Sequence, residues 1–347
     1  MELRNQPSIH IWIYNHFLET VFTEYTPITR RLKARSFSGI SDQLEFFISS
    51  LKQHGYAVSL GKEPRSSALN VVIENFSAHT RDVLTAYCQA TKKRVAVIMT
   101  EHLDFINNEI FIHGEKLSRV NRNDYMHPVT QFNRIKYLMD CLPHIRCLFV
   151  LGDLPELRNM SQVLPGVDVR AIPFPRINPI LGNDGETSDF IKGDLLFAGK
   201  ITEYRHKVLA LLRDKGFSVR RPTKVISRKR RDLEIRSTKL TLNIPQRQNW
   251  RWLSLMRNIA ALRSGRATVS LGTKPDDSKI SACTFQLDLD DHGWSDVLKH
   301  YVEIWPSLYE VAHENYMNMA NEYEQLNKFP HDMFEYWAIT DQVTLHR

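Results

Sequence analysis

The sequence lacks the features that mark several large classes of protein. Its 347 residues include only 4 cysteines and no C-x-x-C pair, so neither a disulfide scaffold nor a zinc site is indicated. No apolar run approaches the length needed to cross a bilayer. With 14 glycines, 15 prolines and no internal repeat, the chain is not of collagen-like or low-complexity type. We expect a globular chain whose cysteines are buried free thiols.

The common catalytic motifs are also missing. There is no H-E-x-x-H, no G-x-S-x-G, no kinase set, no G-x-G-x-x-G and no Walker P-loop. The first residues, Met1 to Pro7, are polar and lack the basic-then-apolar layout of a secretory signal. The predicted localisation is therefore the cytoplasm.

Positive charge is abundant and unevenly spread. The formal net charge is +7, and the segment from Lys200 to Arg266 holds 19 Lys and Arg against 4 Asp and Glu. A solvated basic face and a phosphate-bearing ligand account for this clustering equally well. The net charge of the whole chain by itself suggests an anionic partner.

The pattern of apolar residues predicts an α/β fold with two parallel sheets. In the first half, buried runs with β-branched residues alternate with helical spacing, as expected for βαβ units. A segment with three prolines and two glycines, Pro173 to Gly185, interrupts the pattern and is the predicted linker. The alternation then restarts, and a helical extension follows from Trp294. We predict domains at 1–175 and 186–325 and a final helix within 326–347.

The expected elements are these. In the first domain we expect strands at 9–14, 56–60, 69–73, 95–99, 145–151 and 167–172, with helices at 41–54, 80–91 and 131–142. In the second we expect strands at 195–198, 217–220, 240–244, 267–271 and 285–289, with helices at 204–215, 228–238 and 250–263. A long helical region at 294–323, interrupted at Pro306, and a helix at 329–343 complete the prediction. Ser41 is the expected N-cap of the first helix.

Ligands of open parallel sheets bind outside the carboxyl ends of the strands, so the loops there carry the candidate site residues. After the strand at 195–198, Gly199 allows backbone amides to approach a phosphate, and Lys200 and Arg205 add charge near a helix N-terminus. A plain strand-to-helix turn explains this loop equally well. After the strand at 240–244, hydrogen-bonding side chains are dense, and Arg247 or Arg251 suits a diphosphate; the candidates in this loop are Asn243, Arg247 and Arg251.

Two loops of the first domain supply the remaining candidates. Glu101, His102 and Asp104 follow the strand at 95–99, and a carboxylate beside an imidazole can perform acid–base chemistry or hold a sugar hydroxyl. The loop after the first strand is long, polar and aromatic, and it contributes candidates for acceptor binding, namely His16, Glu24 and Tyr25. No metal site is predicted.

The second half of the chain resembles the donor-binding domain of GT-B glycosyltransferases. The residues that carry the resemblance are LLFAG at 195–199, LTLNI at 240–244, and the helix-and-strand segment 253–270. Arg257, Gly265 and the strand that follows match the family's layout, and this match makes Arg257 a further candidate for donor binding. The resemblance implies two Rossmann-like domains facing a cleft, with Gly199 and Lys200 at the donor diphosphate and a final helix that crosses back to the first domain. It also implies a nucleotide sugar, most often a UDP-sugar, as donor substrate, with no cofactor and no divalent metal required.

The sequence departs from the family at two positions. Where the family has an acidic pair spaced eight residues apart on the donor-domain helix, this chain has Trp252 and Ala260. Two functions follow as hypotheses. The first is a glycosyltransferase whose acceptor is anionic, such as duplex DNA with a modified base, or a lipid-linked molecule. The second is a nucleotide- or nucleic-acid-binding protein without catalysis, which the run Arg228 to Arg231 favours.

Overall fold

The chain folds into two compact units. A computed structural model describes residues 6–13, 38–74, 76–100, 103–106, 109–112, 115–116, 128–152, 164, 166–179, 190–223, 226–248, 250, 253–272 and 278–345. One unit groups Met1–Glu19, Gln43–Pro175 and Tyr323–Arg347, and the other groups Thr20–Asp42 and Arg176–Glu322. The sequence had placed the domains at 1–175 and 186–325. In the structure, the first unit also takes residues from the end of the chain.

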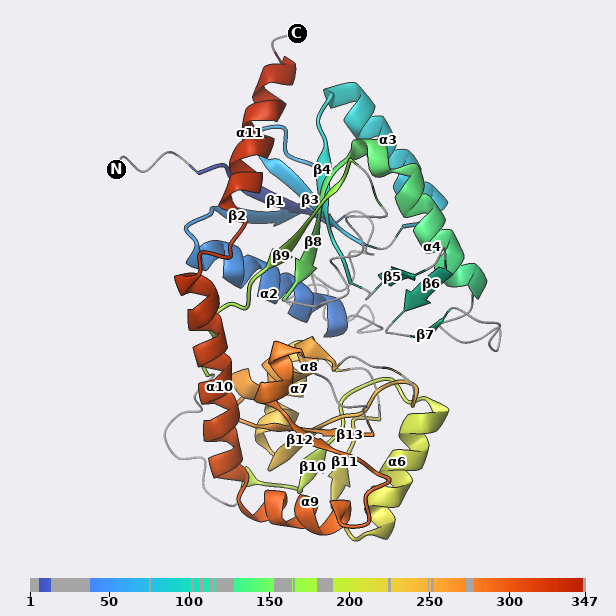
Figure 1. Cartoon of the computed structure of the whole chain (residues 1–347), viewed down its shortest axis with the longest axis vertical. Helices are drawn as coiled ribbons and strands as arrows, with labels where there is room; N and C mark the ends of the chain where they lie inside the picture. Colours follow the sequence, from blue (N-terminus) through green and yellow to red (C-terminus); the bar gives the residue numbers. More distant parts are fainter. Residues whose placement is uncertain are drawn as a thin grey trace. The chain divides into compact units, whose positions relative to one another are not determined.

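The first unit is built on a six-stranded parallel sheet (Figure 1). Its order is β2-β1-β3-β4-β8-β9, so the chain reverses its direction of travel across the sheet between β1 and β3. The strands are β1 Ile9–Trp12, β2 Val58–Gly61, β3 Leu69–Ile73, β4 Val95–Ile98, β8 Ile145–Leu151 and β9 Asp168–Ile172. The helices before the linker are α2 Ser38–Gln53, α3 Ala78–Thr91 and α4 Pro128–Asp140, and a short 3-10 turn spans Leu142–His144.

Central strands of this sheet are buried on both faces. Every residue of β3 is buried, and so is every residue of β4. Continuous burial of this kind requires helices on both sides of a sheet, and it explains why LNVVI and VAVI lack the alternation of a half-exposed strand. Aromatic side chains contribute to the same core, since the rings of Phe47 and Phe149 lie 5.5 Å apart.

The C-terminal helix α11, His331–Leu345, packs within the first unit. Phe334 and Trp337 are fully buried, and the ring of Phe334 stacks 5.2 Å from that of Phe149 on β8. The phenol of Tyr56 shares a 3.0 Å hydrogen bond with Nδ1 of His331. Two helices precede α11 in the chain, α9 Trp294–Glu303 and α10 Trp305–Gln325.

A small antiparallel sheet lies between β4 and α4 in the chain. It consists of β5 Leu103–Ile106, β6 Glu109–Ile112 and β7 Glu115–Lys116, in the order β5-β6-β7. The sequence analysis predicted no strands there. The first two pair through a two-residue connection, and such short hairpins carry a weaker hydrophobic pattern than the buried strands of a parallel sheet.

The second unit contains a five-stranded parallel sheet in the order β11-β10-β12-β13-β14. The strands are β10 Leu195–Leu196, β11 Val219–Arg220, β12 Leu240–Asn243, β13 Thr268–Leu271 and β14 Phe285–Leu287. The connecting helices are α6 Glu203–Asp214, α7 Arg228–Arg236 and α8 Leu255–Arg263, and a 3-10 turn covers Lys279–Cys283. Together the two units confirm the predicted α/β class with two parallel sheets and a helical C-terminal region.

Most helix boundaries differ from the predictions by one to a few residues, and three of the differences have a clear cause. Helix α2 begins at Ser38 and already includes Ser41, so Ser41 is not the N-cap. Helix α8 begins at Leu255, with Ser254 as N-cap, whereas the apolar spacing had suggested Trp250. Trp250 is buried although it lies before the helix, so the apolar spacing that predicted a helix from this residue reflects burial alone. Pro306 lies in the first turn of α10, where its missing N–H is tolerated, and the break comes before Trp305.

All four cysteines are free and buried, as predicted. Burial raises the pKa of the Cys88 thiol to about 12, which makes it a poor nucleophile at neutral pH. None of the helices in the described ranges is long and apolar enough to span a bilayer.

Candidate anion-binding site in the second unit

The topology of the second unit creates one favoured place for a ligand. From β10 the chain passes to β11 on one side, then crosses to β12 on the other side of β10. The loops that leave β10 and β12 therefore diverge at the carboxyl edge of the sheet. In open parallel sheets this divergence is where ligands bind. The first loop starts at Phe197 and the second at Ile244.

Arg257, in the first turn of α8, lies against the backbone of Gly199 in the first of these loops. A Cβ atom at Gly199 would be 3.1 Å from Nη2 of Arg257 and 3.0 Å from Cζ of Phe197. The missing side chain thus leaves room for the guanidinium. On its other side, Nη1 of Arg257 donates a 2.7 Å hydrogen bond to Oδ1 of Asn243, the last residue of β12.

Asn243 is itself held in place. It is 1% exposed, and its amide nitrogen donates to Oγ of Ser270 on β13 at 3.2 Å. A buried amide with both ends satisfied has a fixed orientation. The strand end therefore fixes the direction in which the Arg257 guanidinium points.

Arg205 fastens the two loops together. It is 4% exposed, and its Nε and Nη1 donate at 2.9 Å to the carbonyls of Ile244 and Lys200, one in each loop. Thr202, the N-cap of α6, adds a 2.8 Å hydrogen bond to the carbonyl of Gln246. Arg205 thereby sets the spacing of the loops, and its charge reaches the site through space.

The two guanidinium groups share an aromatic platform. The Cζ atoms of Arg205 and Arg257 lie 5.2 and 5.6 Å from the ring centroid of Phe197, within the range of cation–π attraction. Burial, followed by the charge of Arg257, lowers the pKa of Arg205 to about 8. Burial, followed by the charge of Arg231, lowers the pKa of Arg257 to about 10. A lowered pKa means that the positive charge of each arginine is unfavourable in this environment, so a bound anion would stabilise the site.

In the part of the chain that the structure describes, neither Arg205 nor Arg257 forms an ion pair with a carboxylate. No carboxylate is bonded to either of these two positive charges, and the charge of Asp42 acts on Arg257 only from a distance. Buried or half-buried charges are normally compensated, so an uncompensated pair is typical of a site for an anionic ligand. Lys200 is exposed beside them and adds a third cationic group.

The structure brings together five of the predicted donor-site residues, Gly199, Lys200, Arg205, Asn243 and Arg257. Arg247 lies half-buried in the loop after β12. The remaining predicted residues fall outside the described ranges, except for Asp104, which belongs to β5. Those outside are His16, Glu24, Tyr25, Glu101, His102, Arg251 and Trp252.

Ala260 occupies the position where the resembling family has its second acid. It is 3% exposed and belongs to a core cluster with Leu196 and Ile235. A carboxylate there would be buried among aliphatic side chains, which would be costly. The helix that carries Ala260 thus presents this position to the core.

Two features were missed by the sequence analysis. Glu74 directly follows β3, at the point where the first sheet reverses direction. It is 3% exposed, its Oε2 accepts from Oγ1 of Thr100 at 2.7 Å, and it pairs with Arg134 at 2.6 Å. The sequence did contain a signal for Glu74, because this acidic residue immediately follows the predicted strand LNVVI. Other candidates were chosen because they are polar residues at strand ends.

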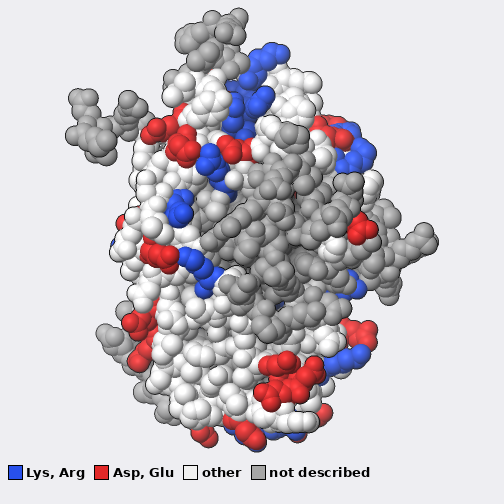
Figure 2. Space-filling view, in the orientation of Figure 1, with Lys and Arg blue, Asp and Glu red and all other residues white. Residues whose placement is uncertain are grey.

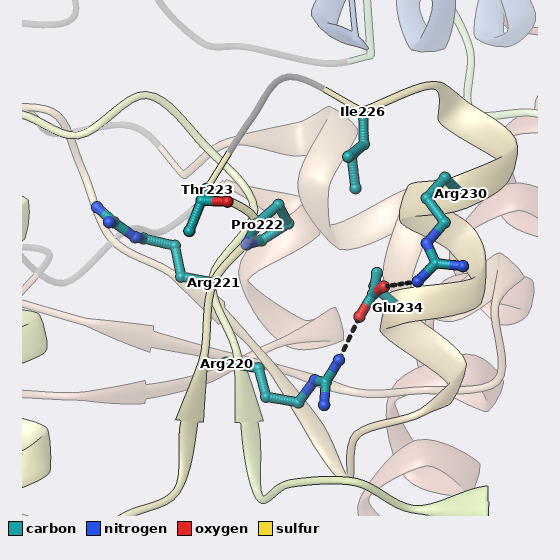
Figure 3. Close-up of a pocket in the computed structure, with 7 residues that line it drawn as sticks. All are labelled: Arg220, Arg221, Pro222, Thr223, Ile226, Arg230 and Glu234. Atoms are coloured by element: carbon teal, nitrogen blue, oxygen red, sulfur yellow. Dashed lines mark hydrogen bonds and ion pairs between the residues drawn. The ribbon is translucent and has the colours of Figure 1, made fainter.

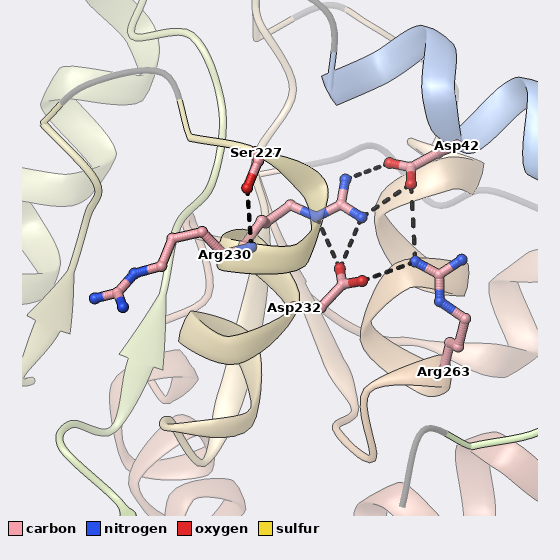
Figure 4. Close-up of polar contacts among 6 residues, drawn as sticks. Asp42, Ser227, Arg230, Asp232 and Arg263 are labelled. Atoms are coloured by element: carbon pink, nitrogen blue, oxygen red, sulfur yellow. Dashed lines mark hydrogen bonds and ion pairs between the residues drawn. The ribbon is translucent and has the colours of Figure 1, made fainter. Parts of the chain in front are cut away.

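The second is a buried charge cluster on α7 and its neighbours (Figure 4). Arg231 donates from two nitrogens to both carboxylate oxygens of Asp42, one of them at 2.9 Å, and also pairs with Asp232 at 2.9 Å. Arg263 pairs with Asp232 at 3.1 Å. Arg231 and Asp42 are each 9% exposed at the side chain. No local pattern links Arg231 to Asp42, which lies 189 positions away.

Comparisons with known proteins give a distant structural likeness. No protein-family model matches the chain, and neither does any curated protein. AviGT4, a glycosyltransferase involved in avilamycin A biosynthesis, is 10% identical over 97% of both chains, with a TM-score of 0.46. The pneumococcal O-GlcNAc transferase GtfA, in complex with UDP and GlcNAc, is 13% identical over 80% of this chain and 57% of its own, with a TM-score of 0.37.

TarM is similar at 10% identity over 80% of this chain and 55% of its own, with a TM-score of 0.42. The chain therefore spans little more than half the length of TarM and of GtfA. At these scores the likeness concerns the general arrangement of helices and strands. The paired α/β architecture itself is established by the two parallel sheets of this chain.

Proposed function

We propose that this protein is a glycosyltransferase that takes its sugar from a nucleotide-sugar donor held by the second unit, and that this donor is a UDP-sugar. The observation that carries the proposal is the placement of Arg257 against Gly199, beside Arg205, where the chain reverses direction across the sheet. Such a pair of unmatched guanidinium groups suits a diphosphate. The resemblance of segment 195–270 to donor-binding domains supports the same assignment.

In this proposal each residue has a separate task. Arg257 and Lys200 contact the diphosphate, and Gly199 allows its backbone to approach. Arg205 is a positioning residue because its Nε and Nη1 donate to the carbonyls of Ile244 and Lys200, which holds the two loops together. When the glycosidic bond to the donor breaks, negative charge grows on the departing diphosphate, and fixed cationic groups stabilise it. These groups supply the charge stabilisation that a metal ion provides elsewhere, so we propose that no divalent metal is needed.

The first unit supplies the acceptor side in this proposal. Glu101, His102 and Asp104 are proposed for acid–base chemistry, and His16, Glu24 and Tyr25 for acceptor contacts. Glu74 joins this group as a carboxylate at the carboxyl edge of the first sheet. Its hydrogen bond from Thr100 and its ion pair with Arg134 hold the carboxylate in a fixed position.

We propose a small anionic acceptor in place of duplex DNA. The run Arg228 to Arg231 does not form a continuous exposed strip, because Arg231 turns inward to Asp42 and Asp232 and Arg230 is paired with Glu234. On the face of the second unit drawn in Figure 2, the described surface shows no continuous basic area. Binding of duplex DNA requires several phosphates to be neutralised in a row.

The proposal is tested by incubating the full chain with UDP-, GDP- and CMP-sugars and measuring release of the nucleotide. We expect slow release from at least one UDP-sugar. Arg257→Ala should weaken binding of that donor by at least tenfold, with a much smaller loss of thermal stability. Arg213→Ala is the matched control, since Arg213 is exposed in the last turn of α6, away from the site. Equal losses of affinity and stability in Arg257→Ala would make Arg257 a structural residue.

A binding protein without catalysis is the alternative function. It is favoured if the chain binds UDP without cleaving any sugar nucleotide in the panel. Binding of DNA with a steep dependence on salt, together with no affinity for nucleotide sugars, would replace the proposal altogether.

A further inference from the structure

A second cluster of arginines surrounds a pocket beside the proposed donor site. The pocket has a volume of about 460 Å³ and lies at the carboxyl end of β11 (Figure 3). It is lined by Arg220, Arg221, Pro222, Thr223, Ile226, Arg230 and Glu234. Strand β11 neighbours β10, and the backbone N–H of Phe197 donates to the carbonyl of Arg220 at 3.0 Å. The pocket thus belongs to the same sheet edge but to a different strand.

Glu234 organises two of these arginines. Its Oε2 accepts from Nη2 of Arg220 at 2.7 Å, and its Oε1 pairs with Nη2 of Arg230 at 2.8 Å. Burial alone would raise the pKa of Glu234, but the hydrogen bonds and charges of Arg220 and Arg230 lower it. The carboxylate is therefore ionised at neutral pH, and it holds two guanidinium groups in fixed positions on either side of itself, as Figure 3 shows.

Hydrogen-bond donors outnumber acceptors around this pocket. A guanidinium carries five N–H donors, and Glu234 engages one nitrogen of each arginine. Nε of Arg220 is buried and has no acceptor among the described residues. Arg221 is exposed and projects from the opposite side of Pro222. Two guanidinium groups thus flank the carboxylate of Glu234, and Arg221 points away from it. With three arginines and one glutamate, the lining keeps an excess of positive charge.

The first turn of helix α7, beside the pocket, carries positive charges that destabilise the N-terminus of the helix. Helix α7 starts after its N-cap Ser227 with Arg228, Lys229 and Arg230, and it has no acidic residue in its first turn. The N-terminus of a helix carries partial positive charge, so cations there are unfavourable and anions favourable. A local conflict of this kind is typical of a functional site. An anion bound in the pocket would relieve it.

We propose that this pocket binds the phosphate group of a small phosphomonoester, separately from the diphosphate site at Gly199. The paired guanidinium groups of Arg220 and Arg230 and the charge of Arg221 match a dianionic phosphate, and Thr223 adds a hydroxyl. The pocket has the volume of a small-molecule site. The inward-facing Arg231 rules out a longer row of phosphate contacts along the first turn of α7.

The test titrates phenyl phosphate and inorganic phosphate into the full chain by calorimetry at constant ionic strength. The titration uses the Arg257→Ala background, with Lys200→Ala as a second background in case the first does not fold. This choice removes binding at the proposed donor site, so the result does not depend on whether a nucleotide sugar is bound. The pocket variant is Arg221→Ala with Arg230→Gln. The matched control, Arg213→Ala with Lys215→Ala, removes the same charge at exposed positions at the end of α6.

We expect one binding event per chain, at least tenfold weaker in the pocket variant and unchanged in the control. Absence of binding in both backgrounds, or an equal loss in the control, would overturn the proposal. Two further arms identify the source of the phosphate. If the pocket variant loses affinity only for vesicles of phosphatidylglycerol, or only for a single-stranded oligonucleotide, the occupant is a polyanionic surface and the proposal is wrong.

Discussion

Gly199 has no side chain at the point where Arg257 places its guanidinium, so the two residues are in direct contact. A Cβ atom on Gly199 would lie 3.1 Å from Nη2 of Arg257. Because Asn243 fixes the guanidinium from the other side at 2.7 Å, the arginine has little room to yield. The position of the Arg257 guanidinium thus requires a residue without a side chain at position 199, whether or not a ligand is bound.

Replacing this glycine gives the first prediction. Gly199→Ala should displace Arg257 and weaken UDP binding by at least about tenfold, or about 1.4 kcal/mol, with little change in thermal stability. Gly293→Ala is the control, because a Cβ there meets nothing within 4 Å and its φ is ordinary for any residue. Calorimetric titration with UDP measures the effect. Unchanged affinity in Gly199→Ala would show that the contact with Arg257 has no role in binding.

The second prediction concerns the buried pair of Asp42 and Arg231. Asp42→Asn leaves Arg231 with Asp232 as its remaining carboxylate, and we expect a loss of about 3 kcal/mol in the free energy of unfolding. Asp296→Asn removes an exposed ion pair with Lys299 and should cost less than about 0.5 kcal/mol. Urea unfolding followed by circular dichroism compares the two. Similar small losses in both variants would mean that the cluster is hydrated in solution.

The third prediction is a dependence of stability on pH. Burial raises the pKa of the Asp341 carboxyl from 3.8 to about 6, against the opposing charges of Lys93 and Arg146. Between these values the folded chain holds a proton that the unfolded chain has released, so this group's contribution falls as pH rises. Relative to Asp341→Asn, the natural chain should lose about 1–3 kcal/mol of unfolding free energy from pH 4 to pH 7.

Urea titrations at pH 4, 5, 6 and 7 measure this difference. Glu335→Gln is the matched control, since Glu335 is an exposed acid on the same helix. A difference between the natural chain and Asp341→Asn that stays constant over this range would contradict a raised pKa at Asp341.

The fourth prediction tests the packing of α11. Phe334 is fully buried and its ring lies 5.0 Å from that of Tyr56, so Phe334→Ala should cost about 3–5 kcal/mol of unfolding free energy. Ile339 is 60% exposed on the same helix, and Ile339→Ala should change stability by less than about 0.5 kcal/mol. Thermal unfolding distinguishes them. A small loss in Phe334→Ala would show that α11 is weakly docked.

Buried strands were the most predictable part of the fold. The runs LNVVI and IRCLFVL correspond residue for residue to β3 and β8, since strands covered on both faces need continuous apolar sequence. The start of α8 was not predictable in this way. Trp250 and Leu253 are buried in an irregular segment, and burial without helical backbone produces the same spacing as a helix turn.

The candidate site was predictable as a set of residues but not as a set of contacts. Gly199 and Asn243 were candidates because each lies at the end of a strand, at the edge where ligands bind, and Arg257 because its helix resembles that of GT-B donor-binding domains. Their mutual contacts depend on the order of strands in the sheet, which the sequence pattern does not report. Arg205 was predicted as a donor-binding residue from its place near a helix N-terminus, and its hydrogen bonds to one backbone carbonyl in each loop could not be predicted from the sequence.

The grouping of segments into units has a consequence for synthesis on the ribosome. The first unit needs residues from Tyr323 onward, including Phe334 and Trp337 of α11, to complete its core. The second unit is composed of residues that are all made before Tyr323. The first unit therefore cannot complete its core until α11 has been made, although its central strands are made in the first half of the chain.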